Sequence, residues 1–127
     1  MRLALDTNSY CAAGRGDART VALVRRATVI CLPFVVLGEL RAGFAAGTIG
    51  QQNDAILTRF LGSPRVTILW ADEHTTHHYA NLFAQLKRQG TPIPTNDIWI
   101  AALVVQHDLA LLTRDEHFSK LGQIAKA

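Results

Sequence analysis

The chain has 127 residues, of which 49% are hydrophobic and 18% charged, and its net charge is +3. This length fits a single domain over residues 1–127, and the apolar content can fill a core, which excludes a mainly disordered chain. No apolar run approaches the roughly 20 residues that a membrane-spanning helix needs. Cys11 and Cys31 form no C-x-x-C pair, and the N-terminus lacks the pattern of a signal peptide. We therefore expect reduced thiols and a cytoplasmic location.

Short apolar runs predict four strands along the chain. They cover residues 3–5, 28–32, 66–69 and 109–113, and they are rich in leucine or in β-branched side chains. Helix-forming segments with apolar spacing or with start and stop residues lie between and after them. These predicted helices cover residues 17–26, 34–46, 51–61, 72–89, 98–105 and a short stretch after Asp115.

Several aromatic residues in or beside the predicted helices are expected to be buried in the core. This expectation covers Trp70, Tyr79, Phe83 and Trp99, because large apolar side chains are usually buried. Valines and alanines of the helix at 17–26 are likewise expected to face inward. Three histidines share the helix at 72–89 with spacing that a transition metal can use, but no fourth ligand accompanies them, which favours an exposed polar face.

Strands and helices alternate throughout, which is typical of an α/β fold. The strand runs are apolar without strict alternation, as expected where helices cover both faces of a mostly parallel sheet. In open sheets of this kind, functional side chains gather at the carboxyl ends of the strands. Acidic residues at those ends are therefore the first candidates for chemistry.

Two carboxylates follow predicted strands. Asp6 ends the first strand, and Asp115 lies two residues beyond the fourth. Because the carboxyl ends of parallel strands share one rim, we expect these two side chains on the same edge of the sheet. Each could also simply cap the helix that follows it, so both interpretations stay open at this point.

Two further carboxylates, Glu39 and Asp97, stand on apolar faces of predicted helices. The residues one turn away are Val35, Val36, Ala42 and Gly43 around Glu39, and Ile100 and Ala101 around Asp97, where the next turn adds Val104. A carboxylate on such a face loses hydration. This loss costs on the order of several kcal/mol unless a partner compensates for it. Glu39 could pair with a buried arginine, and Asp97 could be an ordinary first-turn acid that the helix dipole favours.

Taken together, the four acids predict more than any one of them does. Carboxylates that converge repel one another, and their pKa values rise unless a counter-charge is present. A divalent cation is the usual counter-charge, and an all-oxygen site suits Mg²⁺ or Mn²⁺.

The four acids lie in segments that resemble the PIN-domain ribonucleases, and within them the VapC-type toxins of prokaryotic toxin–antitoxin pairs. The matching segments are LALDTN at 3–8, VLGELRAG at 36–43, NDIWIAA at 96–102 and LTRDxxF at 112–118. The segments occur in the family's order and span nearly the whole chain. Each motif alone is weak, whereas four in register identify the family.

The resemblance implies a three-layer α/β/α sandwich around a mostly parallel sheet of four to five strands. The family's usual fifth strand has only residues 123–127 left to form it here. The resemblance also implies a catalytic site of Asp6, Glu39, Asp97 and Asp115. In that site Asp6, Asp97 and Asp115 hold Mg²⁺ or Mn²⁺, and Glu39 is a further ligand or holds a water molecule. The implied reaction is endonucleolytic hydrolysis of RNA by a metal-activated water.

The same resemblance implies partners and supporting residues. The expected partners are an RNA substrate, such as tRNA or rRNA, a cognate antitoxin that blocks the site, and a second copy in a homodimer. Asn8 and Thr113 stand where the family often has polar groups that assist the acids. Arg41 and Arg114 lie beside the motifs and are candidates for RNA phosphate contacts, although each also fits a solvated surface position. Whether Glu116 faces the metal stays open.

Three other classes remain as alternatives. A PIN-like domain that binds RNA or a partner without cutting is one, although all four acids are present. A phospho-receiver signalling domain has similar length and class, but it expects an acidic pair after the first strand, where this chain has only Asp6, and Asp72 would be its phosphate acceptor. A nuclease acting on DNA is the third, because metal-assisted phosphodiester cleavage needs no 2′-hydroxyl.

Overall fold

One parallel sheet of five strands runs through the computed structural model, which describes residues 1–127. The strands are β1 (Arg2–Leu5), β2 (Val29–Pro33), β3 (Val66–Leu69), β4 (Ala110–Leu112) and β5 (Ala125–Lys126). Their order across the sheet is β3-β2-β1-β4-β5. The helices are α1 (Thr7–Gly14), α2 (Ala18–Arg26), α3 (Phe34–Ala46), α4 (Gly50–Leu61), α5 (Glu73–Gln89), α6 (Thr95–Gln106) and the 3₁₀ helix η1 (Glu116–Lys120).

The central strand β1 is bonded on both sides. Leu3 is in register with Ile30 of β2 and with Ala110 of β4. Its apolar residues are almost completely shielded from solvent, as expected for a parallel strand that is covered on both faces. Burial on both faces explains why this strand and its neighbours read as continuous apolar runs rather than as alternating ones.

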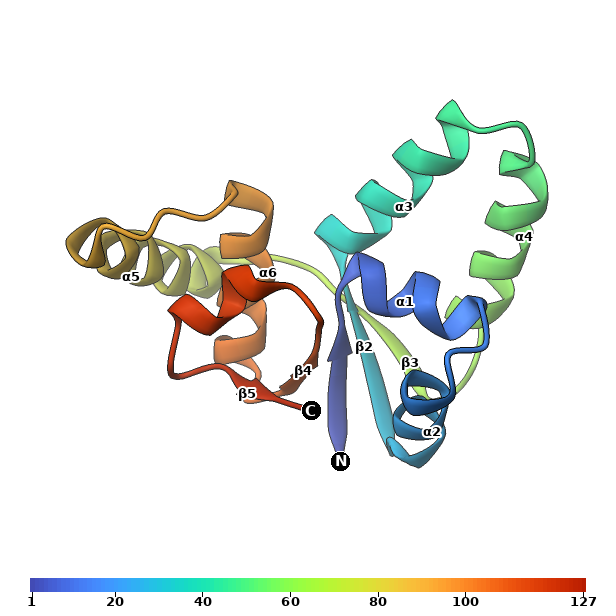
Figure 1. Ribbon diagram of the computed structural model, residues 1–127, viewed down its shortest axis with the longest axis horizontal. Coiled ribbons are helices and arrows are strands. Elements are labelled where there is room, and N and C mark those ends of the chain that lie inside the picture. Colours follow the sequence, from blue (N-terminus) through green and yellow to red (C-terminus); the bar gives the residue numbers. More distant parts are fainter.

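Helices cover the sheet from two sides, which makes three layers (Figure 1). α1 to α4 lie on one side, and α5 and α6 lie on the other. The chain steps outward from β1 to β2 and then β3, and afterwards crosses back to β4 on the far side of β1. Since crossover connections in parallel sheets are right-handed, this change of direction sends the later helices to the opposite face. The predicted α/β/α sandwich is confirmed.

The four predicted strands and the main predicted helices are confirmed, with bounds shifted by a few residues. The fifth strand, which the sequence left open, forms from two residues and pairs with β4 through Ala110 and Ala125. The long helix begins after the cap Asp72 and ends at Gly90, whose φ of 68° is the left-handed conformation that glycine adopts without strain. None of the helices combines the length and apolar character that a membrane crossing requires.

Helix α1 was not predicted, and the burial of several residues was predicted wrongly. Only the small residues Ser9 and Ala12 of α1 are buried, so its sequence lacks the apolar spacing that marks a helix. The alanines at positions 18 and 22 of α2 are exposed. Trp70, which follows the edge strand β3, and Phe83 of α5 are 64% and 48% exposed. Both cysteines are free thiols, as expected.

Replacing a fully buried strand residue tests the core. Leu111 in β4 is completely buried between β1 and β5, so Leu111→Ala should lower the free energy of unfolding by about 3 kcal/mol through lost contacts and a cavity. Ile56, exposed on α4, provides the control: Ile56→Ala should change it by about 0.5 kcal/mol or less. Urea denaturation measures both. Equal effects of the two substitutions would contradict this packing.

Candidate active site

The strand order reverses between β1 and β4, and ligands of open α/β sheets bind at the carboxyl ends of strands beside such a reversal. Asp6 directly follows β1, and Thr113 and Asp115 follow β4. The first turn of α6 brings Asp97 to the same rim, and α3, which begins directly after β2, carries Glu39 toward it (Figure 1). The strand ends and two helices therefore converge on one edge of the sheet.

Asp6 is 5% exposed and uses both of its oxygens in hydrogen bonds. Oδ1 accepts from the backbone N–H of Ser9 at 2.9 Å and so caps α1. Oδ2 accepts from the hydroxyl of Thr113. The Thr113 oxygen in turn accepts from the backbone N–H of Asp115 at 2.9 Å. Asp6 is thus both a helix cap and the buried end of a chain of hydrogen bonds that leads to Asp115.

Asp97 and Asp115 meet at a histidine. Nδ1 of His117 lies 2.7 Å from Oδ2 of Asp97 and 3.1 Å from Oδ1 of Asp115. The same Asp115 oxygen accepts from the backbone N–H of His117 at 2.9 Å and caps η1. One ligand atom from each of the three residues lies within 4.8 Å of the others. These three side chains are the most closely gathered part of the site.

The electrostatic environment raises the pKa of the Asp97 carboxyl. Burial is the largest cause, and the negative charges of Asp115 and Glu39 raise it further, while the hydrogen bond with His117 acts in the opposite direction. The effect of Glu39 on Asp97 places the fourth acid within electrostatic reach of the cluster. Burial and the neighbouring acids therefore both disfavour the ionised form of Asp97.

Glu39 is half-buried at the edge of the cluster, and its Oε1 accepts from the hydroxyl of Thr7 at 2.8 Å. The apolar face predicted around it is only partly correct. Val36 is buried, but Ala42 and Gly43 are exposed, because α3 packs on α4 and extends beyond the sheet (Figure 1). Glu39 thus compensates its partial burial with a threonine hydroxyl, and the alternative of a buried arginine partner is not what the structure contains.

The predicted supporting residues differ in where they lie. Thr113 connects Asp6 with Asp115, as described. Asn8 is exposed and its side chain makes no hydrogen bond within the protein. The guanidinium of Arg114 is 2.6 Å from Asp17, whose pKa lies below its usual range mainly because of the hydrogen bond from Thr20, with Arg114 adding to it. Glu116 is exposed and stands outside the three-residue cluster.

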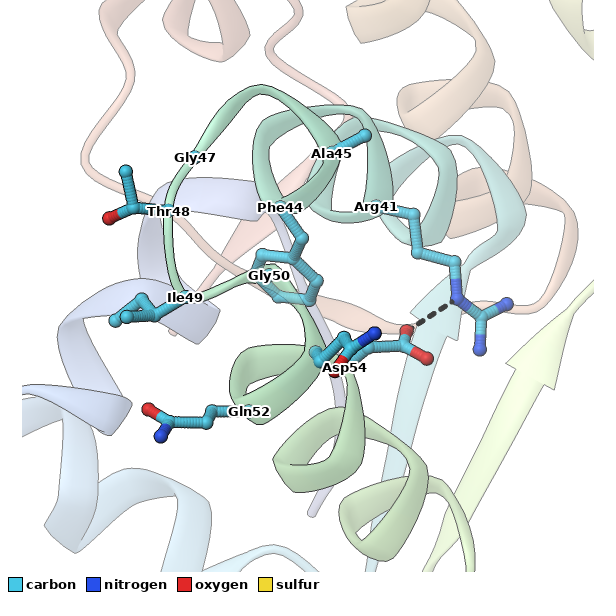
Figure 2. Close-up of a pocket in the computed structure, with 10 residues that line it drawn as sticks. Arg41, Phe44, Ala45, Gly47, Thr48, Ile49, Gly50, Gln52 and Asp54 are labelled. Carbon is cyan, nitrogen blue, oxygen red and sulfur yellow. Dashed lines mark hydrogen bonds and ion pairs between the residues drawn. The ribbon is translucent and has the colours of Figure 1, made fainter.

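Arg41 lines a hollow that is separate from the acidic cluster. This hollow of about 690 Å³ opens at the turn between α3 and α4. Figure 2 shows Arg41 directed to Asp54, with the ring of Phe44 between this pair and Ile49 in the view. Nε of Arg41 and Oδ1 of Asp54 are 3.0 Å apart. The only carboxylate of the hollow is already paired, so it holds no group free for acid–base chemistry.

His117 was missed by reasoning from the sequence. It follows Asp115 by two residues and directly precedes the core residue Phe118, and this proximity to a candidate ligand is the one signal that could have found it. The approach to Asp97 could not have been read from the sequence, because the two residues are 20 positions apart.

The donor set fits a divalent cation. Two carboxylate oxygens and one imidazole nitrogen lie close enough together to share one ion, and the negative charges of Asp115 and Glu39 add to the effect of burial in raising the pKa of Asp97. Oxygen and imidazole nitrogen are both ligands of Mn²⁺ and related ions, and carboxylates are ligands of Mg²⁺.

Comparisons with known proteins identify the family of this chain. Residues 3–124 match the PIN domain family. Ribonuclease VapC4 of Mycobacterium tuberculosis is 31% identical over 90 residues, which are 71% of this chain and 69% of that protein.

Two solved structures share the fold. The DNA-bound VapBC of Salmonella typhimurium superposes with a TM-score of 0.88 at 23% identity, over 100% of this chain and 97% of that one. VapBC-5 of M. tuberculosis, a member of the VapBC family of toxin–antitoxin systems, superposes with a TM-score of 0.63 at 26% identity, over 77% and 82% of the two chains. Since the family match includes all four acids and the strands that position them, this chain belongs to the PIN domain family.

Proposed function

We propose that this protein is a metal-dependent endoribonuclease and the toxin of a toxin–antitoxin pair. The observation that carries the proposal is the convergence of Asp97, Asp115 and His117 within 4.8 Å at the rim where the strand order reverses. The name of the relative VapC4, a ribonuclease, supports RNA as the substrate. The toxin–antitoxin complexes among structures of the same fold support an antitoxin as the partner.

The proposed role of each side chain follows from its burial and from its hydrogen-bond partners. Asp97 and Asp115 offer carboxylate oxygens toward the shared space, and Asp6 holds Thr113 so that Asp115 is fixed in place. Each carboxylate oxygen can accept two bonds, so Asp6 Oδ2 keeps capacity for an ion beside the Thr113 hydroxyl. A divalent cation held by these acids would supply a nucleophilic water near neutral pH and would stabilise charge on the phosphate. Glu39, which accepts a hydrogen bond from Thr7, would hold that water or add a ligand.

Binding of RNA requires positive charge around the acids. Arg114 is exposed next to Asp115, and its pairing with Asp17 is an exposed contact that a phosphate can replace. Arg41 is also exposed but lies in the hollow between α3 and α4, apart from the acids, so Arg114 is the better placed of the two. The proposed substrate is an RNA such as tRNA or rRNA, and the proposed location is the cytoplasm. The proposed assembly is a homodimer.

Asp72, the acceptor that the phospho-receiver alternative requires, has a structural role. Its carboxylate caps α5 through the backbone N–H of Thr75 and also accepts from the amide of Gln106. It stands outside the cluster of Asp97, Asp115 and His117, which favours the nuclease proposal over the phospho-receiver alternative.

Removing one carboxylate tests the proposed activity. Asp97→Asn should lower cleavage of a mixed tRNA and rRNA pool in Mn²⁺ by at least about 100-fold, because a metal ligand is lost. Asp72→Asn is the matched control, because asparagine caps helices as well as aspartate does, and it should retain wild-type activity. Gel analysis of the RNA with and without EDTA measures this. Cleavage that persists in EDTA or in Asp97→Asn would refute the proposed site.

The raised pKa of Asp97 also predicts how stability depends on pH without metal. The folded state binds this proton more tightly than the unfolded state, whose pKa is about 3.9. Its contribution is therefore fully present below about pH 3.9 and is lost as the pH rises through the folded-state value. Asp97→Asn should thus raise the melting temperature in EDTA at pH 7 by a few degrees and gain nothing at pH 3.5.

Asp72 provides a comparison of opposite sign. The hydrogen bonds from Thr75 and Gln106 hold its pKa below the usual value, so its contribution is present above about pH 3.9 and is lost as the pH falls through the folded-state pKa. Asp72→Asn should consequently lower the melting temperature at pH 7 relative to wild type. Thermal melts of the three proteins from pH 3.5 to 7 measure the differences, and two curves that shift in the same direction would contradict the assigned environments.

A further inference from the structure

His117 is the group closest to two of the proposed metal ligands, and the mechanism above does not use it. Its Nδ1 lies 2.7 Å from Asp97 Oδ2 and 3.1 Å from Asp115 Oδ1. The two acids come from different elements, the first turn of α6 and the segment after β4. The imidazole therefore completes a group to which each of these three residues offers one atom.

The backbone directs this ring to the rim. Asp115 caps η1 by accepting from the N–H of His117 at 2.9 Å. The next residue, Phe118, is 1% exposed and packs in the core, whereas the side chain of His117 is 45% exposed. Since consecutive side chains of a tight helix point in different directions, anchoring Phe118 in the core holds the His117 ring over the acids.

The spacing of the three atoms is that of neighbouring ligands around one ion. An octahedral ion with ligands at about 2.1 Å has adjacent ligands about 3.0 Å apart, and the two nitrogen–oxygen separations of 2.7 and 3.1 Å lie on either side of this value. A single N–H on Nδ1 can point well at only one of the two oxygens. In the metal-free protein Nδ1–H donates to Asp97. Nε2 makes no hydrogen bond within the protein, so it can carry the ring proton when an ion takes the place of the Nδ1 proton.

We propose that Nδ1 of His117 is a ligand of the catalytic ion and that it makes this site prefer Mn²⁺ to Mg²⁺. The inference rests on the proposed metal-dependent function and adds a nitrogen to its oxygen ligands. Imidazole is a good ligand for first-row transition metals, whereas Mg²⁺ is bound mainly by oxygen. A histidine that only hydrogen-bonded to the acids would have to leave for either ion, and it would favour neither.

Pulsed EPR of Mn²⁺ bound to the full chain distinguishes these roles. The wild-type protein, loaded with Mn²⁺ alone, should show modulation from a coordinated nitrogen, and His117→Asn should lose it. The substitution should also weaken Mn²⁺ binding by about tenfold while changing Mg²⁺ binding by less than about threefold, as measured by calorimetry. The spectrum is decisive, because residues outside the ligand shell can change metal affinity about 10- to 100-fold as well.

His107→Asn is the matched control. This half-buried histidine directly follows α6, at the end opposite Asp97 and about 15 Å along the helix, so the variant should keep both the nitrogen signal and the wild-type selectivity.

Each other outcome overturns the inference. Wild-type protein that binds Mn²⁺ without nitrogen modulation excludes His117 as a ligand and leaves the proposed function standing, and a nitrogen signal that survives in His117→Asn excludes it too. Wild-type protein that binds no Mn²⁺ overturns the proposed metal dependence together with this inference. The wild-type spectrum needs no variant, so an unstable His117→Asn protein does not prevent a decision.

Discussion

The reversal of strand order at β1 is the constraint on which the candidate site depends. β1 pairs with β2 on one side and with β4 on the other. The segments that follow β1 and β4 therefore leave the sheet at the same rim. Beyond the strands, the hydroxyl of Ser9 donates to the carbonyl of Leu112 at 2.7 Å and keeps the two exits together. Asp6 and Asp115 are consequently placed by backbone pairing and by caps, which are more rigid than a loop.

Packing of apolar residues offsets the cost of bringing like charges together. The helix that carries Asp97 is buried along most of its length, through Ile98, Ile100, Ala101, Ala102, Leu103 and Val104. Burial of a large aliphatic side chain contributes roughly 1.5–3 kcal/mol, so a few such residues compensate for an unfavourable carboxylate. The raised pKa of Asp97, caused mainly by its burial, reflects this unfavourable environment.

Short caps connect this electrostatic arrangement to the fold. Asp6 caps α1 and Asp115 caps η1, and each uses the same carboxylate to face a neighbour in the site. A residue that both caps a helix and contributes to a site is held in one orientation by its backbone bond, which preorganises the acids before any ligand binds. The sequence left open whether these two residues cap helices or belong to a site, and in the structure both cap helices at the rim of the candidate site, so the two roles do not exclude one another.

The sequence by itself determined the parts that depend on local pattern. Buried parallel strands need continuous apolar runs, and helices need their caps and stops, so β1 to β4, the long α5 and the α/β class could be predicted from neighbouring residues. The rim position of Asp6 and Asp115 followed from strand direction alone. The family motifs extended this to Glu39 and Asp97, whose convergence no local pattern could establish.

Only the tertiary structure decided what depends on residues distant in the chain. The approach of His117 to Asp97, the pairing of Arg114 with Asp17 and the exposure of Trp70 all follow from how separate elements pack. Helix α1 was not predicted because it buries only small residues. It is stabilised by the Asp6 cap and by contacts with neighbouring elements. Side-chain contacts across the fold depend on how the whole core packs. A short stretch of sequence does not contain the distant residues that make these contacts.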